Sequence, residues 1–126
     1  MKIEYVARSG YLYSKVTGDF NLQEVQASLP VGIQECVRHK LNKVLVDLTE
    51  LQGYSSMIDR YIYLEALGKL HEDYVQAGHP PISVVYVGSD RFVSDFGYEE
   101  RVAEPYSLTI KTSTNLDEGL EWVTAQ

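Results

Sequence analysis

Two short apolar runs, separated by a long helical pattern, constrain the fold of this chain more than any other feature. The runs are KVLVDL at 43–48 and ISVVYV at 82–87, and both are rich in β-branched residues. Continuous apolar strands of this length are typical of a parallel sheet that is buried on both faces. Apolar residues recur at helical spacing from Ser56 to Gln76, so a helix connects the two strands.

The first forty residues predict a hairpin followed by a helix. KIEYVA and YLYSKV alternate in polarity, and Ser9-Gly10 between them suits a tight turn. Asn21, with Glu24 three residues later, opens a helical pattern that reaches residue 41. Pro30 lacks an amide proton and crowds the preceding turn, so it predicts either a kink or two short helices.

The last third of the chain repeats the alternation of strand and helix. Gly78 and the Pro80-Pro81 pair end the helical pattern that starts at Ser56, and residues 90–104 are weakly helical with a break at Gly97. SLTIKTS at 107–113 resembles an edge strand, and Asn115 with Glu118 opens a last helix. The element order is β-β-α-β-α-β-α-β-α. It predicts an α/β fold with a mixed, mostly parallel sheet of about five strands and about four helices, the first strand being antiparallel to the rest.

Length and composition indicate one acidic domain covering residues 1–126. The net charge of −7 and the isoelectric point of 4.8 argue against nucleic acid or an anionic membrane as the partner. No segment approaches the roughly 20 apolar residues of a membrane span, and the start of the chain has no apolar leader region. We therefore expect a cytoplasmic protein with no stable membrane insertion. The single cysteine, Cys36, excludes an internal disulfide and is expected to pack as a small apolar residue.

The sequence lacks the common catalytic and cofactor motifs. It has no phosphate-binding loop, nucleophile elbow, dinucleotide fingerprint, C-x-x-C or H-E-x-x-H. His71, Glu72 and Asp73 are adjacent on the predicted helix, so they point in different directions and do not converge on one ion. We expect no catalytic residue, no cofactor and no metal.

The segment LQGYSSMIDRY at 51–61 holds the most informative polar group. Ser56 is expected to cap the helix, with Asp59 completing the S-x-x-D pattern. Unpaired amides at a helix start favour negative charge, so Ser56 is also a candidate phosphorylation site. In the simpler interpretation Ser56 is only a cap and Arg60 is solvated.

Large apolar residues at the start of this helix suggest a contact surface. On a helical projection, Ile58, Tyr61 and Ile62 fall on or beside the polar side. Such a patch is typical of a protein interface, including a homodimer contact. The alternative is that the neighbouring helix or the segment 90–104 covers them. The predicted interaction surface comprises Tyr54, Ser55, Ser56, Met57, Ile58, Asp59, Arg60, Tyr61 and Ile62.

A second candidate site lies at the carboxyl ends of the two buried strands. Ligands of open parallel sheets bind at this edge, and the chain places polar or small residues there. The predicted ligand cleft comprises Asp47, Ser56, Arg60, Gly88 and Ser89. Gly88-Ser89-Asp90 is equally compatible with a plain turn and helix cap.

The string KVLVDLTELQGYSSMIDRYIYLEAL resembles the central strand–loop–helix of SpoIIAA-like (STAS) domains, the fold of anti-sigma factor antagonists. The resemblance covers nearly the whole chain in element order, and the closest version is the uncharacterised bacterial STAS/SEC14-like group. It implies a non-enzymatic module that acts through protein contacts. In these antagonists a partner kinase phosphorylates the second serine of an Asp-Ser-Ser-Gly motif. Aligned from LVDL, that motif falls on Ser55, Ser56, Met57 and Ile58.

Two functions follow from the sequence. The first is a regulatory protein–protein interaction through Tyr54–Ile62, with another protein or a second copy of the chain as the partner. The alternative is a domain that binds a small molecule or lipid in the predicted cleft, since the SEC14 part of the resemblance implies an apolar ligand.

Overall fold

The central sheet orders the whole molecule, a computed structural model that describes residues 1–94 and 96–125. Its main path runs through β1 (Lys2–Arg8), β2 (Tyr11–Asp19), β3 (Lys43–Asp47), β5 (Ser83–Val87) and β6 (Thr109–Ser113). β1 is antiparallel to β2, and the other neighbours on this path are parallel. The prediction of an α/β fold with a mixed, mostly parallel sheet is therefore confirmed.

A sixth strand, β4 (Leu51–Gln52), corrects the prediction of five strands. β4 pairs in parallel with the end of β2, at Gly18 and Asp19. Two residues are too few to show an alternating pattern, so periodicity in the sequence does not reveal this strand. β4 buries Leu51 and draws the segment after β3 towards the start of the first helix.

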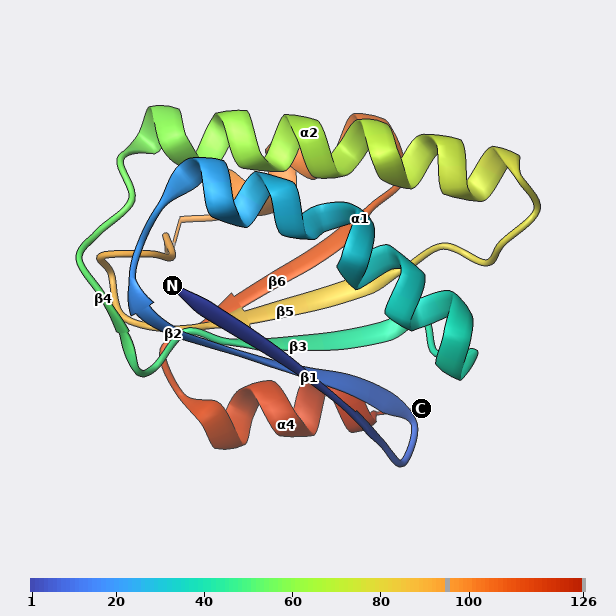
Figure 1. Cartoon of the computed structure of the whole chain (residues 1–126), viewed down its shortest axis with the longest axis horizontal. Helices are drawn as coiled ribbons and strands as arrows, with labels where there is room; N and C mark the ends of the chain where they lie inside the picture. Colours follow the sequence, from blue (N-terminus) through green and yellow to red (C-terminus); the bar gives the residue numbers. More distant parts are fainter. Residues whose placement is uncertain (95, 126) are drawn as a thin grey trace.

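Helices cover both faces of the sheet (Figure 1). α1 (Leu22–His39) and α2 (Met57–Gln76) lie on one face, and α4 (Leu116–Thr124) lies on the other. α3 (Tyr98–Ala103) packs against α2 and continues into the 3-10 turn η1 (Glu104–Tyr106). The break expected at Gly97 is the start of α3, because Gly97 adopts a left-handed conformation with φ of +78°.

α1 is one continuous helix, so the expectation of two short helices is wrong. Its first residue is capped by Asn21, whose side chain accepts a hydrogen bond from the Glu24 amide at 3.0 Å. Figure 1 shows the axis of α1 changing direction partway along its length, which is the bend that a proline inside a helix predicts. Pro30 itself is exposed, whereas Leu29 beside it is buried.

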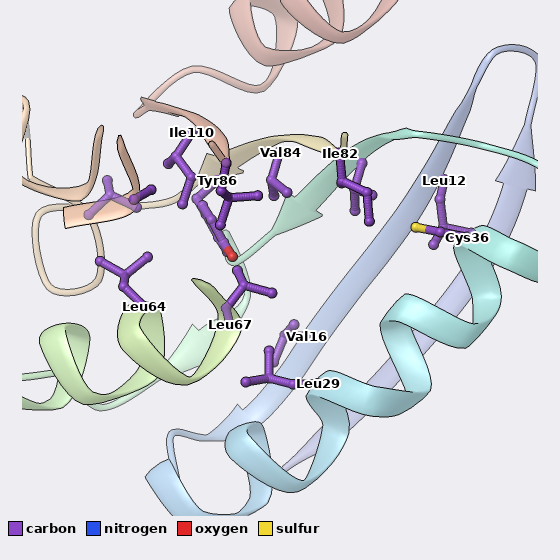
Figure 2. Close-up of a cluster of buried hydrophobic side chains, with 14 of the residues drawn as sticks. Leu12, Val16, Leu29, Cys36, Leu64, Leu67, Ile82, Val84, Tyr86 and Ile110 are labelled. Carbon is purple, nitrogen blue, oxygen red and sulfur yellow. The ribbon is translucent and has the colours of Figure 1, made fainter. Parts of the chain in front are cut away.

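The core has two layers because the central strands alternate between the two faces of the sheet. Val84 and Tyr86 face α1 and α2, while Val85 and Val87 pack with the residues of α4. Figure 2 shows Leu64 and Leu67 projecting from α2 towards the strands of the first layer. Cys36 lies in the same layer, where burial raises the pKa of its thiol to about 11. The expectation that this cysteine packs as an apolar residue is confirmed.

A buried histidine connects α2 to the residue directly before β5 and to η1. His71 is fully buried, and its Nε2 accepts a hydrogen bond from the Ile82 amide at 2.9 Å. Nδ1 of the same ring lies 3.2 Å from the Tyr106 carbonyl, to which it donates in the neutral tautomer. The ring of Tyr106 in turn lies directly over Gly68, where a β-carbon would overlap it.

This packing predicts opposite effects of one substitution at two helical glycines. Gly68→Ala forces Tyr106 away from α2 and is expected to lower the free energy of unfolding by about 1–3 kcal/mol. Gly32→Ala in α1 meets its nearest atom, the Tyr5 hydroxyl, at an ordinary 3.5 Å, so it should raise stability by about 0.5–1 kcal/mol through helix propensity. Urea unfolding of both variants measures the difference. Equal effects at the two positions would show that Tyr106 does not pack on α2 in this way.

Candidate functional site

A complete capping box starts α2. The Ser56 hydroxyl accepts a hydrogen bond from the Asp59 amide at 3.0 Å, and the Asp59 carboxylate accepts one from the Ser56 amide at 3.0 Å. The prediction from the S-x-x-D pattern is confirmed. Two of the amides that a helix start leaves unpaired are thereby satisfied, which fixes where the helix begins.

Exposed apolar side chains surround this helix start. Ile58 is 72% exposed and Tyr54 is 69% exposed, and no segment within 1–94 or 96–125 covers them. The alternative in which the neighbouring helix or residues 90–104 cover these side chains is therefore wrong for the described chain. We call this set the α2-start surface, and it comprises Tyr54, Met57, Ile58, Tyr61 and Ile62.

The α2-start surface continues towards α3. The hydroxyl of Tyr98 donates a hydrogen bond to the Met57 carbonyl at 3.3 Å. The ring of Phe96, which is 57% exposed, lies 6.2 Å from the Tyr98 ring. Aromatic groups from two segments therefore extend the apolar area beyond the helix itself.

Arg60 turns from the start of α2 towards the segment after β5, and its Nη1 also lies 3.8 Å from Sδ of Met57. Its side chain is only 11% exposed, which corrects the interpretation of Arg60 as a solvated residue. Nε donates to the Ser55 hydroxyl at 2.9 Å, Nη1 to the Ser94 hydroxyl at 2.9 Å, and Nη2 to the Asp90 carbonyl at 3.0 Å. A second link in this region runs from the Ser55 amide to the Arg91 carbonyl at 2.9 Å. Together these bonds attach the start of α2 to the turn that follows β5.

Glu99 of α3 completes this buried polar group, and the sequence did not indicate it. The residue is 4% exposed, its Oε1 accepts a hydrogen bond from the Ser94 amide at 2.9 Å, and the same oxygen lies 4.0 Å from Nη1 of Arg60. Oε2 is buried and has no hydrogen-bond partner among the described residues. A buried acceptor without a partner costs on the order of 1–3 kcal/mol, so this oxygen lowers the stability of the folded chain. A glutamate near the start of a short helix ordinarily suggests a solvated dipole partner, which is why the sequence pattern conceals it.

The predicted ligand cleft is not brought together as one site. Asp47 alternates with Val46 and so lies on the α4 face, where Tyr13 donates to it at 2.5 Å and the Thr49 amide at 2.9 Å. Burial opposes ionisation of Asp47, but hydrogen bonds from the Thr49 hydroxyl, the Tyr13 hydroxyl and the Thr49 amide outweigh it and lower the pKa of the carboxyl group. Ser56 and Arg60 lie across the sheet, at the start of α2.

The other two cleft residues form the turn after β5. Gly88 is buried, and a β-carbon there would come within 3.0 Å of the Leu48 Cβ, so the turn packs tightly on the loop after β3. Ser89 is exposed, and its carbonyl accepts hydrogen bonds from the amides of Phe92 and Val93 at 3.0 Å each. The structure therefore places these residues in a turn, and Arg60 donates a hydrogen bond to the Asp90 carbonyl of that turn.

An apolar cavity of about 80 Å³ does lie nearby, beneath the first two turns of α2. Its lining includes residues near the carboxyl ends of β2, β3 and β5, on the α1 and α2 face. Its polar lining includes Ser55, Asp59, Arg60, Glu99, Tyr63 and Tyr86, and its apolar lining includes Val16, Val46, Leu51, Leu64, Phe92 and Val93. We call it the Glu99 cavity. A second cavity of about 90 Å³ shares Val16, Val25, Val46, Tyr63 and Tyr86 with it.

Comparisons with known proteins do not assign this chain to a family. No model of a known protein family matches it, and neither does any curated protein. Within the described residues, no helix is long and apolar enough to cross a membrane, and no group of three or more His, Cys, Asp or Glu residues could hold a metal ion. The fold and the site therefore define an α/β protein with an exposed apolar surface and a buried polar group at one helix start.

The buried bonds of Arg60 predict a large effect of its removal. Arg60→Met leaves Ser55, Ser94 and the Glu99 carboxylate without their charged partner and should lower the free energy of unfolding by at least about 2 kcal/mol. Arg38→Met removes an arginine of α1 whose side chain is 70% exposed, and the expected change there is within about 0.5 kcal/mol. Chemical unfolding compares the two variants, and a similar small effect at both positions would contradict the buried role of Arg60.

Proposed function

We propose that this chain is a non-enzymatic, SpoIIAA-like (STAS) module that binds another protein through the α2-start surface. One observation carries the proposal. Of the eight exposed large apolar side chains among the described residues, five lie within residues 54–62. Apolar side chains gathered in this way are typical of interfaces, whereas single ones scattered over a surface need no explanation. Met and Tyr, which contribute three of the five, are also enriched at interfaces.

The contacts that hold the first turn of α2 in place favour a binding role for the α2-start surface. The capping box fixes the first turn of α2, and Arg60 holds that turn against the segment after β5. A surface that is already ordered loses little conformational entropy when a partner binds, which improves affinity. Exposed apolar groups on a rigid helix start therefore suit a binding site.

Residue chemistry argues for a contact that does not depend on phosphorylation. Met57 occupies the position that aligns with the phosphorylated serine of antagonists, and it is an exposed part of the α2-start surface. Ser56 is engaged in the capping box, so a phosphate on its hydroxyl would have to replace the bond from the Asp59 amide. We further propose that the protein acts in the cytoplasm, with no enzymatic step.

Site-specific photocrosslinking in the native host tests the proposal. A benzophenone amino acid replaces Tyr61, which keeps an aromatic ring on the α2-start surface, and the control replaces Val31, an exposed residue of α1. We expect a discrete adduct with one protein from position 61 only. Ile58→Asp in the same chain should abolish it without loss of stability, because Ile58 is 72% exposed.

The mass of the adduct identifies the partner class. An adduct of twice the mass of the chain indicates a second copy, and sedimentation velocity should then show a dimer that Ile58→Asp dissociates. Identical adducts from positions 61 and 31, or an adduct that Ile58→Asp leaves unchanged, would overturn the proposal.

A further inference from the structure

We infer that β1 pairs in antiparallel fashion with β1 of a second copy of this chain, so that the two sheets join into one across a twofold axis. The inference goes beyond the proposed protein contact and does not depend on it. No residue of β1 belongs to the α2-start surface.

β1 is a regular edge strand. Figure 1 shows it as the outermost strand of the sheet next to β2, which is its only strand neighbour among the described residues. The register runs without a bulge from the pair Lys2–Thr17 to the pair Arg8–Tyr11, and the strand contains no proline. Bulges and prolines commonly prevent an edge from pairing with another strand, so β1 lacks two of the usual protections.

The hairpin determines which backbone groups of β1 are free. Its turn has two residues, so Arg8 and Tyr11, which flank the turn, form a hydrogen-bonded pair. Every second residue back from Arg8 also bonds to β2, whereas Ile3, Tyr5 and Ala7 direct their amides and carbonyls outwards. No other backbone group among the described residues pairs with these three. A row of unpaired groups of this kind is a template for a further strand.

The charged side chains of β1 select one register. A twofold axis joins outward groups to outward groups, so a contact that overlaps most of both strands is centred on Glu4, Tyr5 or Val6. The first places two glutamates together, and the second places Lys2 opposite Arg8. Centring on Val6 instead places Glu4 of each copy opposite Arg8 of the other. Charges often protect an edge strand, but opposite charges directly across a strand pair attract, so here they favour pairing.

Side chains at the selected register are available for the contact. Glu4, Val6 and Arg8 take the non-hydrogen-bonded positions, where facing side chains come closest. Val6 is 44% exposed and meets its own copy on the axis. Arg8 lies over the ring of Tyr13 at 4.7 Å and has no ion-pair partner among the described residues, while Glu4 has only an exposed pair with Lys2. α4 packs mainly on β3, β5 and β6, so it leaves this face of β1 open.

Sedimentation velocity of the wild-type chain tests for the dimer. From about 10 to about 300 µM we expect a shift from monomer to dimer, because a contact through one strand is small for a stable interface. Ile58→Asp changes only the α2-start surface and should dimerise equally. A wild-type chain that stays monomeric throughout would overturn the inference. Loss of the dimer in Ile58→Asp would also overturn it, and would place self-association on the α2-start surface instead.

An exchange of charges tests the register. Glu4→Arg and Arg8→Glu each create like charges at both ends of the contact and should weaken dimerisation by at least about tenfold. An equimolar mixture of the two variants should recover the wild-type affinity, because opposite charges then meet at both ends. Both positions are exposed, and thermal unfolding should show that each variant remains folded. A mixture that associates no better than the separate variants would contradict the pairing of Glu4 with Arg8.

Disulfide formation locates the axis. At the selected register the two copies of residue 6 lie about 4.5 Å apart between Cα atoms, so Val6→Cys should link two chains when oxidised glutathione is added. Glu4→Cys is the matched control, since its two copies lie about 14 Å apart along the strands and should not link. Cys36 is buried, and burial raises the pKa of its thiol to about 11, so it takes no part. Equal rates of linkage in the two variants would rule out an axis at Val6.

Discussion

The hydrogen bonds of Arg60 join the parts on which the rest of the candidate site depends. They connect the start of α2 to Ser94 and the Asp90 carbonyl, 34 and 30 residues further along the chain. Without them, the first turns of α2 and the turn after β5 would lack their main polar connection. Hydrogen bonds to a buried guanidinium are strong because its charge is poorly solvated, so they specify one arrangement of these segments. The exposed surface and the cavity both require that arrangement.

The first two turns of α2 separate the Glu99 cavity from the α2-start surface. Ser55, Asp59 and Arg60 face the Glu99 cavity, whereas Ile58, Tyr61 and Ile62 are exposed on the outside. This division follows from helical geometry, since residues three or four apart share one side. Because the two sets have no member in common, substitutions in one leave the residues of the other intact. The inferred pairing of β1 involves neither set, so each proposal can fail without affecting the other.

Sequence patterns predicted the elements well and the burial of polar side chains poorly. Apolar runs identified both central strands, and the S-x-x-D pattern identified the start of α2, because these signals are local. The simpler interpretation took Arg60 as solvated, although it belongs to a helical stripe of buried positions: Arg60, Leu64, Leu67, His71 and Tyr74. Its burial depends on Ser94 and Glu99, which lie far away in sequence. Asp47 was placed in a cleft with Arg60, yet the alternation of β3 puts it on the opposite face, so strand parity could have excluded that pairing.

Amide hydrogen exchange at Ser55 tests most directly whether the start of α2 is held as described. The Ser55 amide donates to the Arg91 carbonyl across two segments, outside any helix or strand. If Arg60 fixes these segments, exchange at Ser55 should be slowed by at least about a hundredfold relative to an unstructured chain, and Arg60→Met should remove most of that protection. Exchange at the unstructured rate in the wild-type protein would contradict a rigid start of α2.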